Sequence, residues 1–308
     1  MTGSARVGNV ISGGMVSGPV IQAGRIDGGV HLHHHPPPPV PRQLPATPRV
    51  WVDREEDLDA LARACRGGGD GVRCVAISGP GGAGKSALAV RLLRMVDADA
   101  GHAQMYVDLR GHSGRAPLRP VDVLARFLRA FGHGLGAALP ADEDELAAWW
   151  RSVTGGRTVT VLADNAADAD QIRPLMPGGT GGLVVVTSRM PLEDLAVEGA
   201  AIHHLRPLPR KAAIDLITRL AGTAGAAADP CAIPRVADAC AHNALALRAA
   251  AARLVIRPGT TLSQIAASLT APTTAPSGPR ELDQLQGAAV VTSINQAYAD
   301  LPSEAAAA

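Results

Sequence analysis

The 308-residue chain is long enough for one α/β core and a smaller second unit. Hydrophobic residues make up 46% of it and charged residues 19%, so most of the chain can bury a core, which must rest on Ala, Val and Leu because aromatic residues are only 2%. The 29 basic residues nearly balance the 28 acidic ones. This balance argues against a dominant basic surface, so nucleic acid is not expected as a partner.

The cysteine pattern and the lack of long apolar runs indicate the compartment. Cys65, Cys74, Cys231 and Cys240 form no C-x-x-C pair, so we expect small buried hydrophobic residues in a reducing environment. The start of the chain has no signal-peptide pattern, and no apolar run approaches the roughly 18 residues that span a bilayer. We therefore expect a cytoplasmic protein with no membrane partner.

The first 48 residues differ in composition from the rest. Residues 1–34 are rich in glycine, and Ile11-Ser12-Gly13-Gly14-Met15 recurs as Ile26-Asp27-Gly28-Gly29-Val30. Short β-prone pieces joined by glycines can stack as cross-β layers. The alternative for this segment is a disordered tail. Residues 35–48 are rich in proline and predict an extended polyproline-II linker.

The globular part begins near residue 49 and has an α/β pattern. Apolar runs predict strands over 72–78, 105–109, 158–163 and 183–187, and helical spacing predicts helices over 85–96 and 120–131. Because strands alternate with helices, we expect a doubly wound parallel sheet within residues 49–208. From about residue 209 the strands stop, and helices over 211–220 and 236–254 predict a small bundle within 209–285. A further helical pattern over 290–301 has no core left to pack on, as expected of a fold that is cut short.

The strongest motif is Gly79-Pro80-Gly81-Gly82-Ala83-Gly84-Lys85-Ser86. It matches the phosphate-binding loop G-x-x-x-x-G-K-[ST] and lies between a predicted strand and a predicted helix, as that motif requires. Its glycines allow successive N–H groups to surround phosphate oxygens, and the start of the helix adds its positive dipole end. Lys85 would contact the β- and γ-phosphates, and the Ser86 hydroxyl would bind Mg²⁺.

Three residues outside the loop complete the predicted phosphate site. Asp164 closes the apolar run 159–163 and is the candidate second ligand of Mg²⁺; a structural capping role is the alternative. Asn165 follows where many ATPases have a second acid, and an amide cannot accept a proton from water, so hydrolysis should be slow unless Asp168 or Asp170 substitutes. Arg189 follows the strand predicted over 183–187, where a cation could sense the γ-phosphate; an exposed loop arginine is the alternative.

A series of short segments resembles the NB-ARC branch of the STAND signal-transduction ATPases. These segments are Trp51-Val52-Asp53-Arg54-Glu55, the phosphate loop, Tyr106-Val107-Asp108-Leu109-Arg110-Gly111, Leu162-Ala163-Asp164-Asn165-Ala166, Val186-Thr187-Ser188-Arg189, Leu205-Arg206-Pro207-Leu208 and Ala246-Leu247-Arg248. Each is weak alone, but their order and spacing from residue 51 to about 301 are specific. The amino-terminal segment 9–34 is similar to amyloid signalling motifs of the RHIM type.

The resemblance implies an α/β nucleotide-binding domain, a helical ARC domain, and the first helix of a winged-helix domain over 286–308. It implies ADP or ATP as ligand, with contacts from Val52, Arg54, Ala87 and Pro207 in addition to the loop. Proteins of this kind rest with buried ADP, exchange it for ATP and then form homo-oligomers. A downstream effector with a cognate motif would be the partner of residues 1–34.

The chain departs from the family pattern at two places within its length. Asp53 replaces a glycine, and His242-Asn243-Ala244-Leu245 replaces Gly-Leu-Pro-Leu, so the proline that packs on adenine is missing. The sequence therefore predicts a nucleotide-dependent signalling switch with slow turnover. A metabolic P-loop enzyme, such as a small-molecule kinase, and the ATPase part of a transcriptional regulator are the alternatives.

Overall fold

The computed structural model describes residues 39–67, 71–96, 102–112, 115–134, 139–257 and 259–270. The expected cross-β segment (1–34) and the expected start of a winged helix (286–308) lie outside these residues. Both stay predictions.

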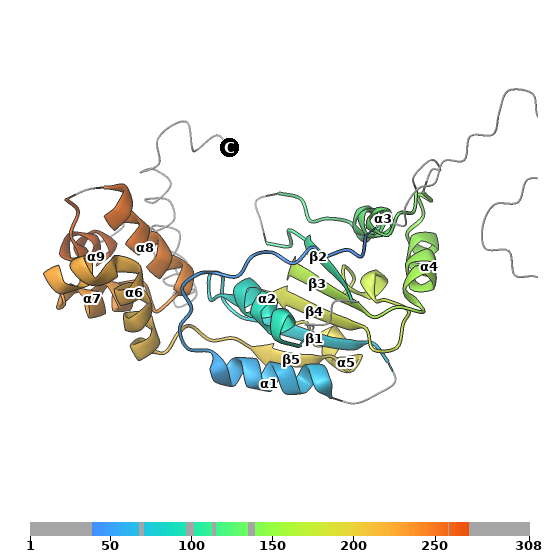
Figure 1. The fold of residues 1–308 in the computed structure, drawn as a ribbon, viewed down its shortest axis with the longest axis horizontal. Coiled ribbons are helices and arrows are strands. Elements are labelled where there is room, and N and C mark those ends of the chain that lie inside the picture. Colours follow the sequence, from blue (N-terminus) through green and yellow to red (C-terminus); the bar gives the residue numbers. More distant parts are fainter. Residues whose placement is uncertain are drawn as a thin grey trace, which may run out of the picture. The chain divides into compact units, whose positions relative to one another are not determined.

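A parallel sheet of five strands forms the centre of the α/β part, in the order β2-β3-β4-β1-β5 (Figure 1). The predicted doubly wound α/β fold is confirmed, and the strands β3 and β4 are buried along nearly their whole length, as continuous apolar runs require. The strands are β1 (Arg73–Ser78), β2 (Ala103–Asp108), β3 (Val159–Ala166), β4 (Leu183–Ser188) and β5 (Ala201–His204).

Helices cover both faces of this sheet and bury two separate apolar cores. One core joins α1 (Glu55–Arg66) and α2 (Lys85–Val96) to β1, and the other joins α3 (Pro120–Ala130) and α4 (Glu143–Thr154) to β2 and β3. The scarce aromatic residues gather in the second core, where the Trp150 ring lies 5.3 Å from that of Phe127. The short helices η1 (Arg173–Leu175) and α5 (Glu193–Val197) complete this part.

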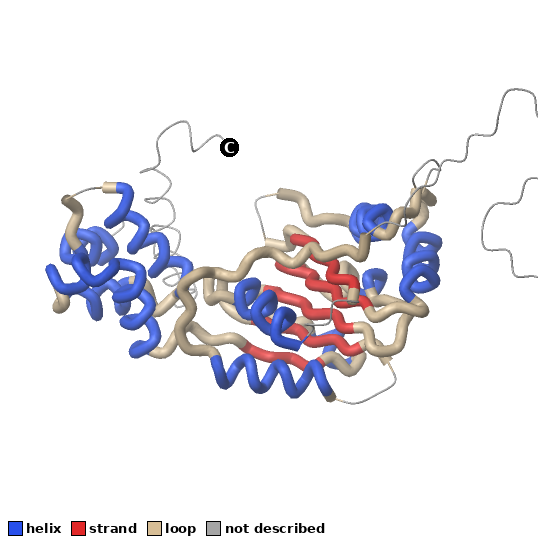
Figure 2. The backbone as a smooth tube through the Cα atoms, viewed as in Figure 1, coloured by secondary structure: helices blue, strands red, loops and turns tan. Residues whose placement is uncertain are grey.

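A bundle of four helices follows, with a core of its own (Figure 2). It consists of α6 (Arg210–Ala228), α7 (Ala232–Ala239), α8 (Ala244–Ile256) and α9 (Leu262–Thr270). The single helix expected over 236–254 is wrong: the chain turns between α7 and α8, where Ala241 and His242 have positive φ angles of 48° and 57°. Because neither residue is glycine or proline, their types give no sign of the break.

The described part of the proline-rich segment, from residue 39, contacts the sheet and is not a free spacer. The amide of Gln104 in β2 donates to the carbonyl of Pro41 over 2.8 Å, and the amide of Gln43 donates to the carbonyl of Gln104 over 2.8 Å. Residues 41–43 therefore pair with the outer edge of β2. Pairing of this kind covers an exposed sheet edge.

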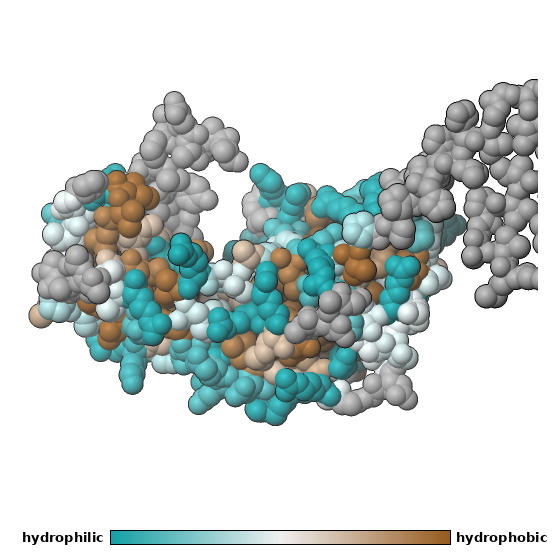
Figure 3. All heavy atoms as spheres, in the orientation of Figure 1, coloured by the Kyte–Doolittle hydropathy of each residue, from teal (hydrophilic) through white to brown (hydrophobic). Residues whose placement is uncertain are grey.

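The surface exposes one cysteine and few large apolar side chains. Cys65 and Cys240 are buried and Cys74 is half-buried. Cys231 is exposed, so the expectation of four buried cysteines is wrong for this residue, which precedes α7 without a side-chain cap bond. Hydrophilic side chains cover much of the visible face of the α/β part, whereas apolar residues gather over the helical bundle (Figure 3). Within the described residues, no helix has the length and apolar character that a bilayer span would need.

Candidate nucleotide-binding site

The phosphate loop joins the end of β1 to the start of α2, as the motif predicts. Gly79 has a φ of 145°, and a Cβ atom there would lie 2.3 Å from the carbonyl oxygen of Leu205. Gly82 and Gly84 also have positive φ angles, of 76° and 102°. The loop conformation therefore requires glycine at these positions, because side chains rarely adopt such angles.

Two cationic side chains lie against this loop. The Lys85 ammonium donates to the carbonyls of Gly79 over 2.7 Å and Pro80 over 2.9 Å. The Arg189 guanidinium lies 3.7 Å from the position that a Cβ atom would take at Gly81. Burial and the charge of Arg189 lower the pKa of Lys85, Asp164 opposes the shift, and the resulting pKa is about 8. An anion between these cations would relieve their repulsion.

The two predicted magnesium ligands meet in the structure. The Ser86 hydroxyl donates a 2.7 Å hydrogen bond to a carboxylate oxygen of Asp164, which is only 8% exposed. The Thr187 hydroxyl donates to the same carboxylate. A hydroxyl and a carboxylate are the hard oxygen ligands that Mg²⁺ takes, together with water and phosphates. No cluster of three or more His, Cys, Asp or Glu residues exists in the described ranges, so a metal would need such outside ligands.

Asp164 does not end its strand as the sequence suggests. β3 continues to Ala166 through an irregularity after Ala163, and Asn165 has a φ of 58° within it. The Asn165 side-chain amide donates to Asp108 over 3.3 Å. Both alternative bases have structural partners, because Asp168 accepts from the amide of Gln171 over 3.0 Å and Asp170 forms an ion pair with Arg173.

His112 is a further side chain at this place that the sequence reasoning missed. It follows β2 on a loop that is fixed to β3, since the Gly111 amide donates to the Asn165 carbonyl over 2.7 Å. Its Nδ1 is buried without a hydrogen-bond partner. Burial lowers the pKa of His112, and the charges of Arg189 and Lys85 lower it further. No known motif includes this histidine, so only its position after β2 could have marked it.

An adjoining pocket lies beside the start of α2. Predicted nucleotide contacts line it, namely Val52, Arg54, Ala83, Gly84 and Ala87. Sequence reasoning missed other lining residues, among them Trp51, Leu208, Leu216, Ala244 and Arg248. Pro207 is not among the lining residues, although its neighbour Leu208 is. The indole Nε1 of Trp51 is buried without a hydrogen-bond partner. Mostly apolar walls with few polar groups suit a flat base.

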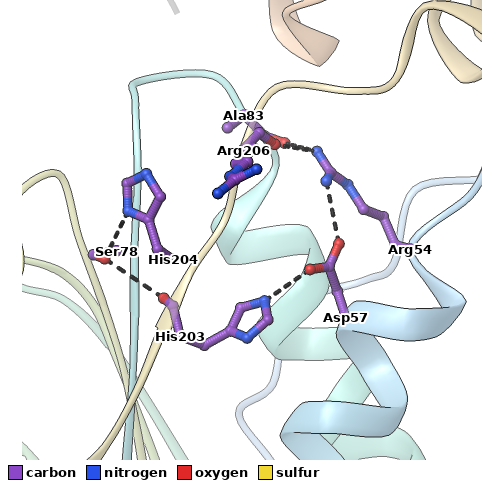
Figure 4. Close-up of polar contacts among 7 residues, drawn as sticks. All are labelled: Arg54, Asp57, Ser78, Ala83, His203, His204 and Arg206. Atoms are coloured by element: carbon purple, nitrogen blue, oxygen red, sulfur yellow. Dashed lines mark hydrogen bonds and ion pairs between the residues drawn. The ribbon is translucent and has the colours of Figure 1, made fainter.

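Arg54 fixes one wall of this pocket (Figure 4). Its guanidinium donates to the carbonyl of Arg206 over 2.7 Å and pairs with Asp57 at 3.2 Å. Asp57 also contacts the Nε2 of His203 at 2.8 Å. Asp53 and Arg54 both have positive φ angles, of 55° and 83°, a region of the backbone that favours glycine. Arg54 is therefore buried as a structural link between the segment before α1 and the one after β5.

The fold and the loop define the chain as a protein with the P-loop NTPase fold. No protein-family model matches it. The chain is 38% identical over 276 residues to the regulatory protein AfsR of Streptomyces coelicolor, covering 87% of this chain and 27% of AfsR. It is 39% identical over 247 residues to AfsR of Streptomyces griseus, covering 80% of this chain and 24% of that protein. The chain thus spans about a quarter of these curated relatives.

Solved structures with the same fold are more distant in sequence. The ORC2 protein of Aeropyrum pernix, in complexes with ADPNP and ADP, has a TM-score of 0.50 at 17% identity, over 75% of this chain and 71% of that chain. A Pyrococcus horikoshii STAND protein with a tetratricopeptide repeat sensor has a TM-score of 0.45 at 16% identity, over 86% of this chain and 35% of that chain.

The expectation that excludes nucleic acid as a partner is wrong. The two AfsR proteins, which match most of this chain, are by name regulatory proteins. A balanced charge describes only this segment, and the segment covers about a quarter of AfsR. It therefore excludes nothing about the partners of a longer protein.

Proposed function

We propose that this chain binds ADP or ATP with Mg²⁺ and acts as a nucleotide-dependent switch of the STAND type. The contact between Ser86 and Asp164 carries the proposal, because it joins the hydroxyl of the phosphate loop to an acid on a different strand. Lys85 and Arg189 supply the positive charge for the phosphates. A Mg²⁺ ion at Ser86 and Asp164 would supply charge neutralisation between the β- and γ-phosphates.

The position of the adjoining pocket supports a switch more than a metabolic enzyme. Its walls come from the α/β part, through Ala83 and Ala87, and from the helical bundle, through Leu216, Ala244 and Arg248. A base bound there would contact both parts at once. Occupancy would therefore stabilise their association, and exchange of the nucleotide would alter it.

Similarity to AfsR over most of this chain favours a role as the nucleotide-binding part of a larger regulatory protein. A transcriptional regulator is one kind of protein in which the chain would be such an ATPase part. We further propose that the ATP state forms homo-oligomers and that residues 1–34 then engage an effector. That step depends on residues outside the described ranges.

One experiment separates the switch from a small-molecule kinase. The protein is purified, denatured, and its released nucleotide identified by chromatography. The switch predicts a tightly held adenine nucleotide, mainly ADP, and phosphate release that candidate acceptors do not accelerate. An acceptor that raises turnover by orders of magnitude would favour the kinase instead.

A further inference from the structure

Asn243 lies at the start of α8, and its side chain forms hydrogen bonds both to the phosphate loop and to the first turn of α8. Its carbonyl oxygen accepts from the amides of Leu245 over 3.1 Å and Ala246 over 3.2 Å, which caps α8. Its amide nitrogen donates to the carbonyl of Gly81 over 2.7 Å. Asn243 is 3% exposed, so both bonds are shielded from water.

A second bond joins the same helix end to the next residue of the loop. The amide of Leu245 donates to the carbonyl of Gly82 over 3.0 Å. The fit leaves no room for a side chain, because a Cβ atom at Gly82 would lie 2.5 Å from the Asn243 carbonyl oxygen. The two consecutive loop carbonyls, of Gly81 and Gly82, are therefore both held by the start of α8.

These bonds fix the direction of the loop amides. A peptide group is planar and trans, so its N–H points opposite to its carbonyl. Because the carbonyls of Gly81 and Gly82 are directed to α8, the N–H groups of Gly82 and Ala83 are directed away from it. The Ala83 amide donates to the carbonyl of Pro80 over 3.3 Å, so a phosphate oxygen at Ala83 would replace or share that bond. N–H groups of such loops take the phosphate oxygens of a nucleotide.

We propose that Asn243 is a positioning residue for the phosphate loop. Because Asn243 belongs to the helical bundle, the affinity of the loop for phosphate would depend on contact between the bundle and the loop. The inference rests on the proposed nucleotide binding. The related motif Gly-Leu-Pro-Leu has leucine at this position, and a leucine side chain has no donor for the Gly81 carbonyl. The side-chain part of this coupling, the bond from the Asn243 amide to Gly81, is thus specific to a chain with asparagine here, whereas the Leu245–Gly82 bond comes from the backbone.

The test separates the loop contact from the helix cap. Asn243→Ser keeps a capping hydroxyl but is too short to reach Gly81, and Asn243→Asp keeps the capping oxygen but loses the donor. Asp142→Ala is the matched control, because Asp142 caps α4 by accepting from the Glu145 amide over 3.0 Å and lies on a different helix from the loop contact. Calorimetric titrations with ADP–Mg²⁺ and with adenosine are compared for each variant, beside thermal unfolding.

Both Asn243 variants should weaken ADP binding by about fivefold, as expected of one lost hydrogen bond, and leave adenosine binding unchanged. Asp142→Ala should lower the unfolding temperature and leave both affinities unchanged. Wild-type ADP affinity in both Asn243 variants, or an equal loss for adenosine and ADP, would overturn the positioning role. A wild-type protein that binds neither ligand would instead overturn the proposed function, and with it this inference.

Discussion

The hydroxyl of Ser86 lies 2.7 Å from a carboxylate oxygen of Asp164, although the two residues are far apart in the chain. This contact predicts that Mg²⁺ strengthens ADP binding in the wild-type protein. In Asp164→Asn the stimulation should disappear, because an amide carries no charge for the ion. The dissociation constant for ADP, measured by titration once with Mg²⁺ and once with a chelator, gives the effect of the ion on binding.

Ser188→Ala is a suitable control for this prediction. Its hydroxyl donates to the carbonyl of Ala166 over 2.9 Å and is not part of the proposed metal site. It should retain the stimulation by Mg²⁺. Equal stimulation in the wild-type protein and in Asp164→Asn would remove Asp164 from the metal site.

Hydrolysis of ATP should be slow, on the order of one turnover per minute or less, against about 10 s⁻¹ for a median enzyme. The reason is Asn165, whose amide cannot take a proton from water and is bonded to Asp108. Asn165→Asp should raise the rate of phosphate release. A wild-type rate of several per second, with no gain in Asn165→Asp, would show that another group is the base.

His112 should distinguish ATP from ADP. It follows Gly111, whose amide is bonded to Asn165 beside Asp164, and its Nδ1 has no partner, so we expect it to donate to an added γ-phosphate. His112→Ala is therefore expected to weaken ATP binding several-fold, by the loss of one hydrogen bond, and ADP binding little. Equal affinities of the variant and the wild-type protein for ATP would exclude that contact.

The lowered pKa of His112 also gives a pH dependence with a defined sign. The folded protein binds fewer protons here than the unfolded chain, so the stability from this group is present above the ordinary histidine pKa and is lost as the pH falls. A bound triphosphate should raise the pKa again. At pH 6, where Lys85 is already protonated, ATP binding should take up protons, and His112→Ala should reduce this uptake in calorimetry across buffers.

The four cysteines should differ in reactivity. Burial raises the pKa of Cys65 to about 11 and that of Cys74 to about 12, so few thiolates form at neutral pH. Cys231 is exposed. A maleimide at pH 7.5 should therefore label Cys231 first, and Cys231→Ser should remove the fast phase. Fast labelling of Cys65 or Cys74 would show that the α/β core opens readily.

The sequence predicts the sheet well where its signals are local. The helix over 85–96 has the same limits in the structure, and the strand predicted over 72–78 is β1, Arg73–Ser78. β5 was missed because its four residues, Ala201–His204, are two apolar residues followed by two histidines, which is too short and irregular to predict a strand. It is held by long-range contacts, such as that of Ser78 with the His204 ring at 3.2 Å.

The residues of the candidate site also fall into those that local motifs predict and those that only the fold reveals. Lys85, Ser86, Asp164 and Arg189 could be named from motifs, and the structure brings them together. Asn243 and His112 could not, because their roles depend on which loops meet in three dimensions. A capping asparagine before α8 is visible in the sequence, but its bond to Gly81 spans two parts of the fold.

The central claim is that an adenine nucleotide binds at the phosphate loop, and calorimetric titration of the nucleotide-free protein with ADP–Mg²⁺ tests it most directly. The wild-type protein should bind one ADP. Lys85→Ala should weaken binding by about tenfold to a hundredfold, as expected for the loss of a charged donor. Lys211→Ala, which removes an exposed lysine on α6, is the matched control and should bind as the wild-type protein does. An unchanged dissociation constant in Lys85→Ala, or no binding to the wild-type protein, would contradict the account.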